Sequence, residues 1–136
     1  MISRMKPFAH GVDIVSCDRL RKAIEKHGDR FLHRVFTQVE LDYCAGKKRR
    51  IEHLAGRFAA KEAVLKVLGT GWQNGISWTE IEVSNLPSGQ PQVNLSGKCK
   101  QIAEGQGLQR FLISISHIET HAISSAIALD GEVASH

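Results

Sequence analysis

Hydrophobic and polar positions alternate near the start of the chain, over residues 10–16. Val12 and Ile14 share one face of this extended segment, and Asp13 and Val15 share the other. The alternation predicts a strand, and one of its faces carries the carboxylate of Asp13 together with the apolar side chain of Val15.

The hydrophobic period then lengthens to that of helices. Ser16 or Asp18 can cap a first helix that runs to about His27, and Gly28 ends it. Residues 37–40, Thr-Gln-Val-Glu, form a capping box, in which the first and fourth residues satisfy each other's backbone donors. The pattern predicts helices from residue 16 or 18 to about 27, around 31–35, from 37 to about 45, and over roughly 51–68.

The second half of the chain is richer in strands. Residues 87–90 form a turn, and Ser96 can cap a short helix. We expect strands over 78–84, 91–95, 110–117 and 122–129, and a helix over 97–105. This order predicts a single α+β domain over residues 1–136, with a core of about 10–130 and a long central helix packed on an antiparallel sheet. The ends, residues 1–7 and 130–136, are expected to fray.

The helix predicted over 51–68 carries a carboxylate in the middle of its apolar stripe. A step of 100° per residue places Glu62 about 20° from Ile51. A buried carboxylate must be paired, hydrogen-bonded or bound to a metal, or it protonates. Glu62 is therefore a candidate site residue, although Glu62 and Lys66 also have the spacing of a common solvated pair. The stripe consists of Ile51, Leu54, Ala55, Phe58 and Leu65.

Composition excludes several classes of protein. The chain has 136 residues, 42% hydrophobic and 24% charged, which is ordinary for a globular domain. No stretch approaches the roughly 18 apolar residues of a membrane span, and residues 1–10 lack the apolar core of a signal peptide. A cytoplasmic protein is expected. Cys17, Cys44 and Cys99 are widely spaced and odd in number, which indicates free thiols.

Positive charge gathers in two places along the chain. The net charge is +4 and the pI is near 9.2. Residues 47–50 read Lys-Lys-Arg-Arg, and a second basic group lies between residues 19 and 30. Such clusters attract phosphates or acidic partners, although a solvated basic face explains them equally well. Few aromatic residues and no reader motif are present, which disfavours nucleic acid as the partner.

Asp13 and Glu62 are the first candidates for chemistry. Two carboxylates that converge repel each other unless a cation neutralises them. Mg²⁺ suits such a pair, because it accepts one or two carboxylates, keeps several waters and binds substrate phosphates. The alternative, that the two residues never meet, stays open at this point.

Cationic side chains form the second group. Arg57, Lys61 and Lys66 lie near Glu62 along the helix and suggest a polyphosphate ligand. A solvated basic helix face is the alternative, and it is favoured for Lys61. Residues 69–71, Gly-Thr-Gly, allow the backbone to approach a ligand or simply end the helix. His117, at the polar end of a strand, is a further candidate for phosphate binding.

Four blocks of sequence together resemble the holo-acyl carrier protein synthases, the small stand-alone type of 4′-phosphopantetheinyl transferase. They are Gly-Val-Asp-Ile-Val at 11–15, Phe-Thr-Gln-Val-Glu-Leu-Asp-Tyr-Cys at 36–44, Leu-Ala-Gly-Arg-Phe-Ala-Ala-Lys-Glu-Ala-Val-Leu-Lys at 54–66 continuing to Gly71, and Ile-Ser-Ile-Ser-His at 113–117. The resemblance covers residues 11 to about 129. It implies transfer of the phosphopantetheine arm of coenzyme A to a serine of apo-acyl carrier protein.

The resemblance also implies roles for single residues. Asp13 and Glu62 would bind Mg²⁺, which bridges to the pyrophosphate of coenzyme A. Lys66 would contact the phosphate and assist proton transfer, with a metal-positioned water as the alternative base. The other residues expected to contact coenzyme A are Arg49 near the 3′-phosphate, Arg57 and His117 at the nucleotide end, Gly69 and Thr70 along the pantetheine, and Lys61.

The family further implies a homotrimer whose sites are shared between neighbouring subunits. Val64, Val67 and Leu68 make the far side of the long helix apolar, which agrees with burial on both sides. Acyl carrier proteins are small and acidic, so the early basic residues are expected to dock them: Arg19, Arg21, Lys26 and Arg30. Two other functions stay open, namely a non-catalytic module that binds coenzyme A or an acidic protein, and a basic nucleic-acid-binding protein.

Overall fold

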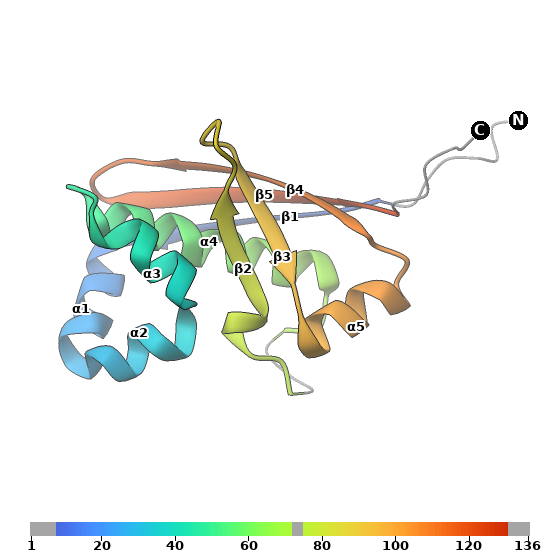
Figure 1. Cartoon of the computed structure of the whole chain (residues 1–136), viewed down its shortest axis with the longest axis horizontal. Helices are drawn as coiled ribbons and strands as arrows, with labels where there is room; N and C mark the ends of the chain where they lie inside the picture. The colour runs from blue at the N-terminus through green and yellow to red at the C-terminus, as the bar shows by residue number, and fades with distance from the viewer. Residues whose placement is uncertain (1–7, 72–74, 131–136) are drawn as a thin grey trace, which may run out of the picture.

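A long helix, α4 (Arg50–Leu68), lies against one face of a three-stranded antiparallel sheet in the computed structural model (Figure 1). The structure describes residues 8–71 and 75–130. The sheet has the order β1-β5-β4 and consists of β1 (Phe8–Ser16), β4 (Arg110–His117) and β5 (His121–Leu129). The two edge strands, β1 and β4, are therefore separated by β5.

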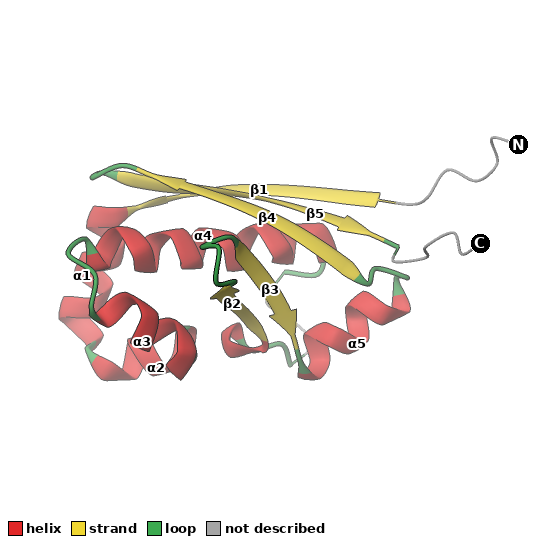
Figure 2. Cartoon of the chain, turned by 45° about the horizontal axis from the view of Figure 1, so that its top comes forward, coloured by secondary structure: helices red, strands yellow, loops and turns green. Residues whose placement is uncertain are grey.

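Two groups of smaller elements lie on the same side of the sheet as α4 (Figure 2). The first group follows β1 and comprises the helices α1 (Cys17–His27), α2 (Asp29–Val35) and α3 (Gln38–Ala45). The second group follows α4 and comprises the 3₁₀ helix η2 (Trp78–Glu80), the hairpin of β2 (Ile81–Asn85) and β3 (Pro91–Leu95), and the helix α5 (Gly97–Gly105). The helices therefore cover one face of the sheet only.

Two of the predicted helix caps are present, whereas Ser96 occupies the N-cap position of α5 without a side-chain capping hydrogen bond. The hydroxyl oxygen of Ser16 accepts a hydrogen bond from the N–H of Arg19 at 3.2 Å. Thr37 and Glu40 form the reciprocal capping box, with the N–H of Thr37 donating to Oε1 of Glu40 at 2.8 Å. Gly69 ends α4 at a φ of 76°, a left-handed conformation that favours glycine.

The α+β class and most element boundaries predicted from the sequence are confirmed, with two differences. The first strand begins at Phe8 rather than at residue 10. Residues 78–80 form η2 rather than the start of a strand, because the Glu80 carboxylate accepts hydrogen bonds from the N–H groups of Ser77 and Cys99 and closes a turn there. The predicted fraying falls mainly on residues 1–7 and 131–136, which lie outside the described part of the chain.

Close packing of β1 against α4 depends on a glycine. A Cβ added to Gly11 would lie 2.3 Å from the carbonyl oxygen of Ala63 and 3.1 Å from Cβ of Lys66. Only glycine lets the strand approach the helix this closely. Asp13 follows two residues later on the same face of β1, so this approach sets its distance from α4.

The face of the sheet that points away from α4 is apolar and exposed. Its exposed side chains come from all three strands; for example, Ile14 on β1 is 61% exposed. Apolar patches of this kind mark interaction surfaces. Within residues 8–71 and 75–130, no helix has the length and apolar character needed to span a membrane. The exposed face consists of Val12, Ile14, Leu112, Ile123 and Ile127.

Candidate functional site

Asp13 and Glu62 line the same cleft, which confirms that the two predicted carboxylates converge. The cleft has a volume of about 360 Å³ and lies between β1, α1 and α4. Its apolar walls include Leu20 and Phe58, and Arg19 lies at its edge. Asp13 faces the cleft because it occupies the α4-facing side of β1, opposite the buried Ser124 of β5.

Lys66 joins this group through Asp13. Its Nζ lies 2.9 Å from Oδ1 of Asp13 and donates a second hydrogen bond of 2.9 Å to the carbonyl oxygen of Val12. The Lys66 side chain is about half exposed and lines a neighbouring hollow that shares Asp13 with the cleft. A carboxylate and an ammonium group are thus held together where a phosphate can approach.

Glu62 is half-buried rather than enclosed in the core. The helical wheel placed it at the centre of the apolar stripe, but the cleft opens beside this turn of α4 and also leaves Phe58 half-buried. A half-buried carboxylate on the wall of a cleft pays less desolvation than a fully buried one, which suits a metal-binding role better than full burial.

The donor set of this cleft fits Mg²⁺. Mg²⁺ requires near-octahedral oxygen ligation and is held in proteins by one or two carboxylates, completed by water and substrate phosphates. Asp13 and Glu62 supply two carboxylates. In the described part of the chain, no group of three or more His, Cys, Asp and Glu side chains gathers as a metal cage. The cleft therefore has the character of an open site and lacks that of a structural metal centre.

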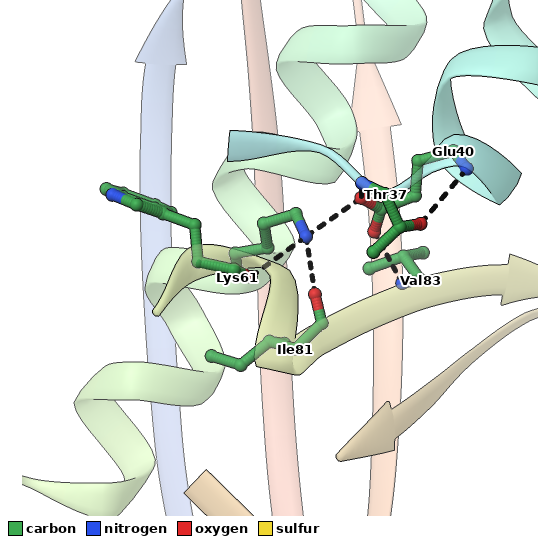
Figure 3. Close-up of polar contacts among 6 residues, drawn as sticks. Thr37, Glu40, Lys61, Ile81 and Val83 are labelled. Atoms are coloured by element: carbon green, nitrogen blue, oxygen red, sulfur yellow. Dashed lines mark hydrogen bonds and ion pairs between the residues drawn. The ribbon is translucent and has the colours of Figure 1, made fainter. Parts of the chain in front are cut away.

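Lys61 does not join the cleft, and its expected contact with coenzyme A is not supported by its position. Its ammonium group is fully buried and forms an ion pair of 2.8 Å with Oε1 of Glu40 (Figure 3). It also donates to the carbonyl oxygens of Trp78 and Ile81. Burial lowers the pKa of Lys61, and the Glu40 carboxylate opposes this shift. The solvated helix face favoured for Lys61 from the sequence is therefore wrong.

Arg57 and His117 meet in a second cleft, of about 170 Å³, on the other edge of the sheet. Arg57 is 4% exposed, and its guanidinium carbon lies 4.1 Å from the centre of the Tyr43 ring. Its Nη2 donates to Oδ1 of Asn85, while its buried Nε has no hydrogen-bond partner among the described residues. A buried guanidinium with an unused donor is suited to an anionic ligand.

His117 is paired with a carboxylate in this cleft. Its Nδ1 lies 2.7 Å from Oε1 of Glu52, and its ring stacks edge-on against His53 at 5.0 Å between centroids. Burial, followed by the charges of His117, Arg57 and Lys47, lowers the pKa of His53. His53 therefore holds a proton less readily than a free imidazole does.

Sequence reasoning missed three residues that line the second cleft, namely Tyr43 of α3, His53 of α4 and Asn85 at the end of β2. It also missed Glu52 of α4, which contacts His117 of that cleft. Glu52 sits in the first turn of α4 and resembles an ordinary solvated helix residue in the sequence. Its contact with His117 spans 65 positions, and a single sequence carries no signal for such a pairing.

The remaining predicted residues lie at the surface around the two clefts. Arg49 is the N-cap of α4, with its Nε 4.0 Å from Oε2 of Glu52. Gly69 and Thr70 follow α4 beyond Lys66. The basic residues expected to dock a partner are all exposed on α1 and α2, and of these only Arg19 lines the first cleft. They are Arg19, Arg21, Lys26 and Arg30.

A family model matches almost the whole described chain. The model of the 4′-phosphopantetheinyl transferase superfamily aligns with residues 9–127. The chain belongs to this superfamily. The holo-[acyl-carrier-protein] synthase of Koribacter versatilis is 43% identical over 120 residues, which cover 88% of this chain and 96% of that protein. A synthase of the same name from Thermoanaerobacter sp. is 47% identical over 122 residues, which cover 90% of this chain and 87% of that protein.

Solved structures of the transferases agree with the fold. The holo-[acyl-carrier-protein] synthase of Neisseria meningitidis has a TM-score of 0.80 and 32% identity, covering 88% of this chain and 96% of its own. The Helicobacter pylori synthase, solved in complex with coenzyme A, has a TM-score of 0.77 and 32% identity, covering 88% of this chain and 98% of its own. The family and fold class predicted from the sequence are confirmed.

Proposed function

We propose that this transferase moves the 4′-phosphopantetheine group of coenzyme A to a serine hydroxyl of apo-acyl carrier protein and releases adenosine 3′,5′-bisphosphate. Superfamily membership and the names of the relatives support the reaction. The observation that carries the proposal is that Asp13 and Glu62 line one cleft and that Asp13 is ion-paired with Lys66. Such transfer depends chiefly on positioning and charge neutralisation.

Mg²⁺ is the proposed cofactor, held by Asp13 and Glu62. When bound, it neutralises charge on the pyrophosphate and polarises the phosphoryl group. Lys66 contributes a fixed positive charge, oriented by Asp13 and by the carbonyl of Val12, that stabilises the phosphate oxygens. The serine oxygen bonds to the pantetheine-bearing phosphorus, the pyrophosphate P–O bond breaks so that adenosine 3′,5′-bisphosphate leaves, and a water accepts the serine proton while the Lys66 ammonium group contacts the phosphate.

The nucleotide end of coenzyme A is assigned to the second cleft, with Arg57 and His117 as ligands and Arg49 nearby. Gly69 and Thr70 are assigned to the pantetheine side. The unused Nε of Arg57 supports an anion in this cleft.

The two clefts favour a site shared between subunits. Asp13 lies on β1 and His117 on β4, with β5 between them and α4 packed on the same sheet face. The two clefts thus lie at different edges of one sheet. The exposed apolar face of the sheet offers a contact between copies, and we propose a homotrimer in which one copy supplies the metal pair and its neighbour supplies the nucleotide cleft.

The protein substrate is proposed to dock on α1. Arg19 lies both on the exposed face of α1 and at the edge of the cleft that contains Asp13. An acidic carrier protein held by Arg19, Arg21, Lys26 and Arg30 would present its serine to this cleft. We place the reaction in the cytoplasm; the buried, free state of the three cysteines agrees with a reducing compartment.

Intact-mass spectrometry of apo-acyl carrier protein tests the proposal. The carrier is incubated with the chain, coenzyme A and Mg²⁺, and a parallel sample contains EDTA. We expect a phosphopantetheine mass gain that EDTA abolishes. Glu62→Gln should lose the gain, whereas the control Glu104→Gln, on the exposed face of α5, should keep it. Binding of coenzyme A without any mass gain would instead support a non-catalytic binding module.

A further inference from the structure

The two cationic side chains of the second cleft are each hydrogen-bonded to a residue that has no role in the proposed function. Nη2 of Arg57 donates to Oδ1 of Asn85, the last residue of β2. Nδ1 of His117 lies 2.7 Å from Oε1 of Glu52, which is 7% exposed. The partners come from different elements, so each cation is held independently.

Asn85 orients Arg57 without neutralising it. The Nδ2 of Asn85 donates a 2.9 Å hydrogen bond to the carbonyl oxygen of Gly89, which fixes the amide so that its oxygen accepts from the guanidinium. An aspartate would accept the same hydrogen bond but would cancel the charge of Arg57. The neutral amide leaves the charge of the buried guanidinium uncompensated, and the buried Nε has no hydrogen-bond partner among the described residues.

Glu52 orients His117 in a complementary way. A carboxylate at Nδ1 makes that nitrogen the donor within the protein and leaves Nε2 as the ring atom available to a ligand. A ring that carries both protons can donate from Nδ1 to Glu52 and from Nε2 to a phosphate oxygen at the same time. Two other groups face this pair: Arg49, 4.0 Å from the second oxygen of Glu52, and the ring of His53.

We propose that Asn85 and Glu52 are positioning residues that hold Arg57 and His117 to receive one phosphate monoester, the 3′-phosphate of coenzyme A. The inference rests on the proposed function and deepens it. A doubly charged phosphate gains most from two charged donors on different walls of one small cleft, whereas a ligand without that phosphate gains little. The arrangement therefore predicts selectivity for coenzyme A over 3′-dephospho-coenzyme A.

Asn85→Asp tests the charge argument, because it changes one atom type and adds a negative charge beside Arg57. We expect the KM for coenzyme A to rise about tenfold, because the compensated guanidinium attracts the phosphate less and that attraction is on the scale of one charge-assisted hydrogen bond, with kcat within about twofold. The KM for 3′-dephospho-coenzyme A should stay within about twofold of wild type. Asn94→Asp, which adds the same charge at an exposed position of β3, is the matched control and should change neither value.

Glu52→Gln tests the second positioning residue, and coenzyme A is again compared with 3′-dephospho-coenzyme A as the substrate. The glutamine amide oxygen still accepts a hydrogen bond from Nδ1 of His117 but carries no negative charge. The KM for coenzyme A should therefore again rise about tenfold, while the KM for 3′-dephospho-coenzyme A stays constant. The inference would be overturned if the KM for both substrates changed equally in either variant, or if the KM for coenzyme A did not change. A general structural effect would act on both substrates alike, because it does not depend on the 3′-phosphate.

A binding measurement separates failure of this inference from failure of the proposed function. Calorimetry compares adenosine 3′,5′-bisphosphate with adenosine 5′-monophosphate on the wild-type chain, Asn85→Asp and Glu52→Gln. We expect the wild type to prefer the bisphosphate and both variants to lose that preference. If the wild type transferred nothing yet kept this pattern, the transferase proposal would fail and the 3′-phosphate site would stand; no preference in the wild type would overturn the site.

Discussion

The Nζ of Lys61 lies 2.8 Å from Oε1 of Glu40, and both side chains are fully buried. The same carboxylate accepts from the N–H of Thr37 at 2.8 Å and, through Oε2, from the N–H of Val83 at 2.7 Å. One carboxylate thus joins the start of α3, the strand β2 and the helix α4 (Figure 3). Since Glu62 follows Lys61 directly, this buried network fixes the rotation of α4 that turns Glu62 toward the first cleft.

Breaking this pair should destabilise the fold strongly. Lys61→Met leaves the Glu40 carboxylate buried and short of its cation, so the free energy of unfolding should fall by about 3–5 kcal/mol. Adding Glu40→Gln should recover part of this loss, because the amide still accepts from Thr37 and Val83 without an unpaired charge. Denaturant unfolding measures both variants.

Lys100→Met, at an exposed position of α5, is the control for the Lys61 prediction and should stay within about 0.5 kcal/mol of wild type. If Lys61→Met were as stable as the control but bound coenzyme A more weakly, Lys61 would be a ligand residue, and the structural role described above would be wrong.

Gly11→Ala should move β1 away from α4. The new Cβ would lie 2.3 Å from a backbone oxygen, which cannot yield without a shift of strand or helix. We expect a loss of about 1–3 kcal/mol in thermal unfolding experiments and a weaker Lys66–Asp13 contact, hence lower turnover. Gly105→Ala is the control, because a Cβ at that position meets nothing within 4 Å. Equal behaviour of the two variants would contradict the close-approach argument.

The sequence predicted the parts of the molecule that depend on local patterns. The capping box at residues 37–40 and the apolar stripe of α4 are local, and the helices form where these signals place them. The patterns pointed Asp13 and Glu62 toward the interior but left open whether they meet, and only the family resemblance implied a shared site.

Long-range pairing limited the rest of the prediction. The helical wheel placed Glu62 at the centre of the buried face, yet Lys61 is the charged residue of α4 that is fully enclosed. The difference arises from Glu40, 21 positions earlier, whose carboxylate makes burial of an ammonium group favourable. The wheel describes one helix and contains no information about what α3 and β2 bring to it.

Arg19 should affect the carrier protein more than coenzyme A. We expect Arg19→Glu to raise the KM for an acidic acyl carrier protein about tenfold or more, and to weaken the salt dependence of that KM, while the KM for coenzyme A changes little. Arg34→Glu, which reverses an exposed charge on α2, is the control and should have a much smaller effect. If both reversals acted equally, the carrier would be responding to net charge rather than to a docking face.

Ile127 should be required for the proposed contact between copies. Ile127→Lys places a charge on the apolar sheet face, so light scattering should report a smaller assembly and turnover should fall with it. Leu86→Lys, in the turn between β2 and β3, changes a side chain of similar exposure (38% against 39%) away from this face and is the control. An unchanged mass for Ile127→Lys would exclude the sheet face as the interface.

Mixing two inactive variants tests whether each site is built from two copies. Glu62→Gln damages the metal pair and His117→Ala damages the nucleotide cleft, so each alone should have low turnover when coenzyme A is below the wild-type KM. In co-refolded mixtures, a neighbouring pair can combine an intact Glu62 from one chain with an intact His117 from the other, which restores about a quarter of the sites in a randomly assembled trimer. If each site were built from a single chain, every site in the mixture would still contain one damaged residue. Turnover of the mixture that stayed at the level of the separate variants would therefore contradict the shared arrangement.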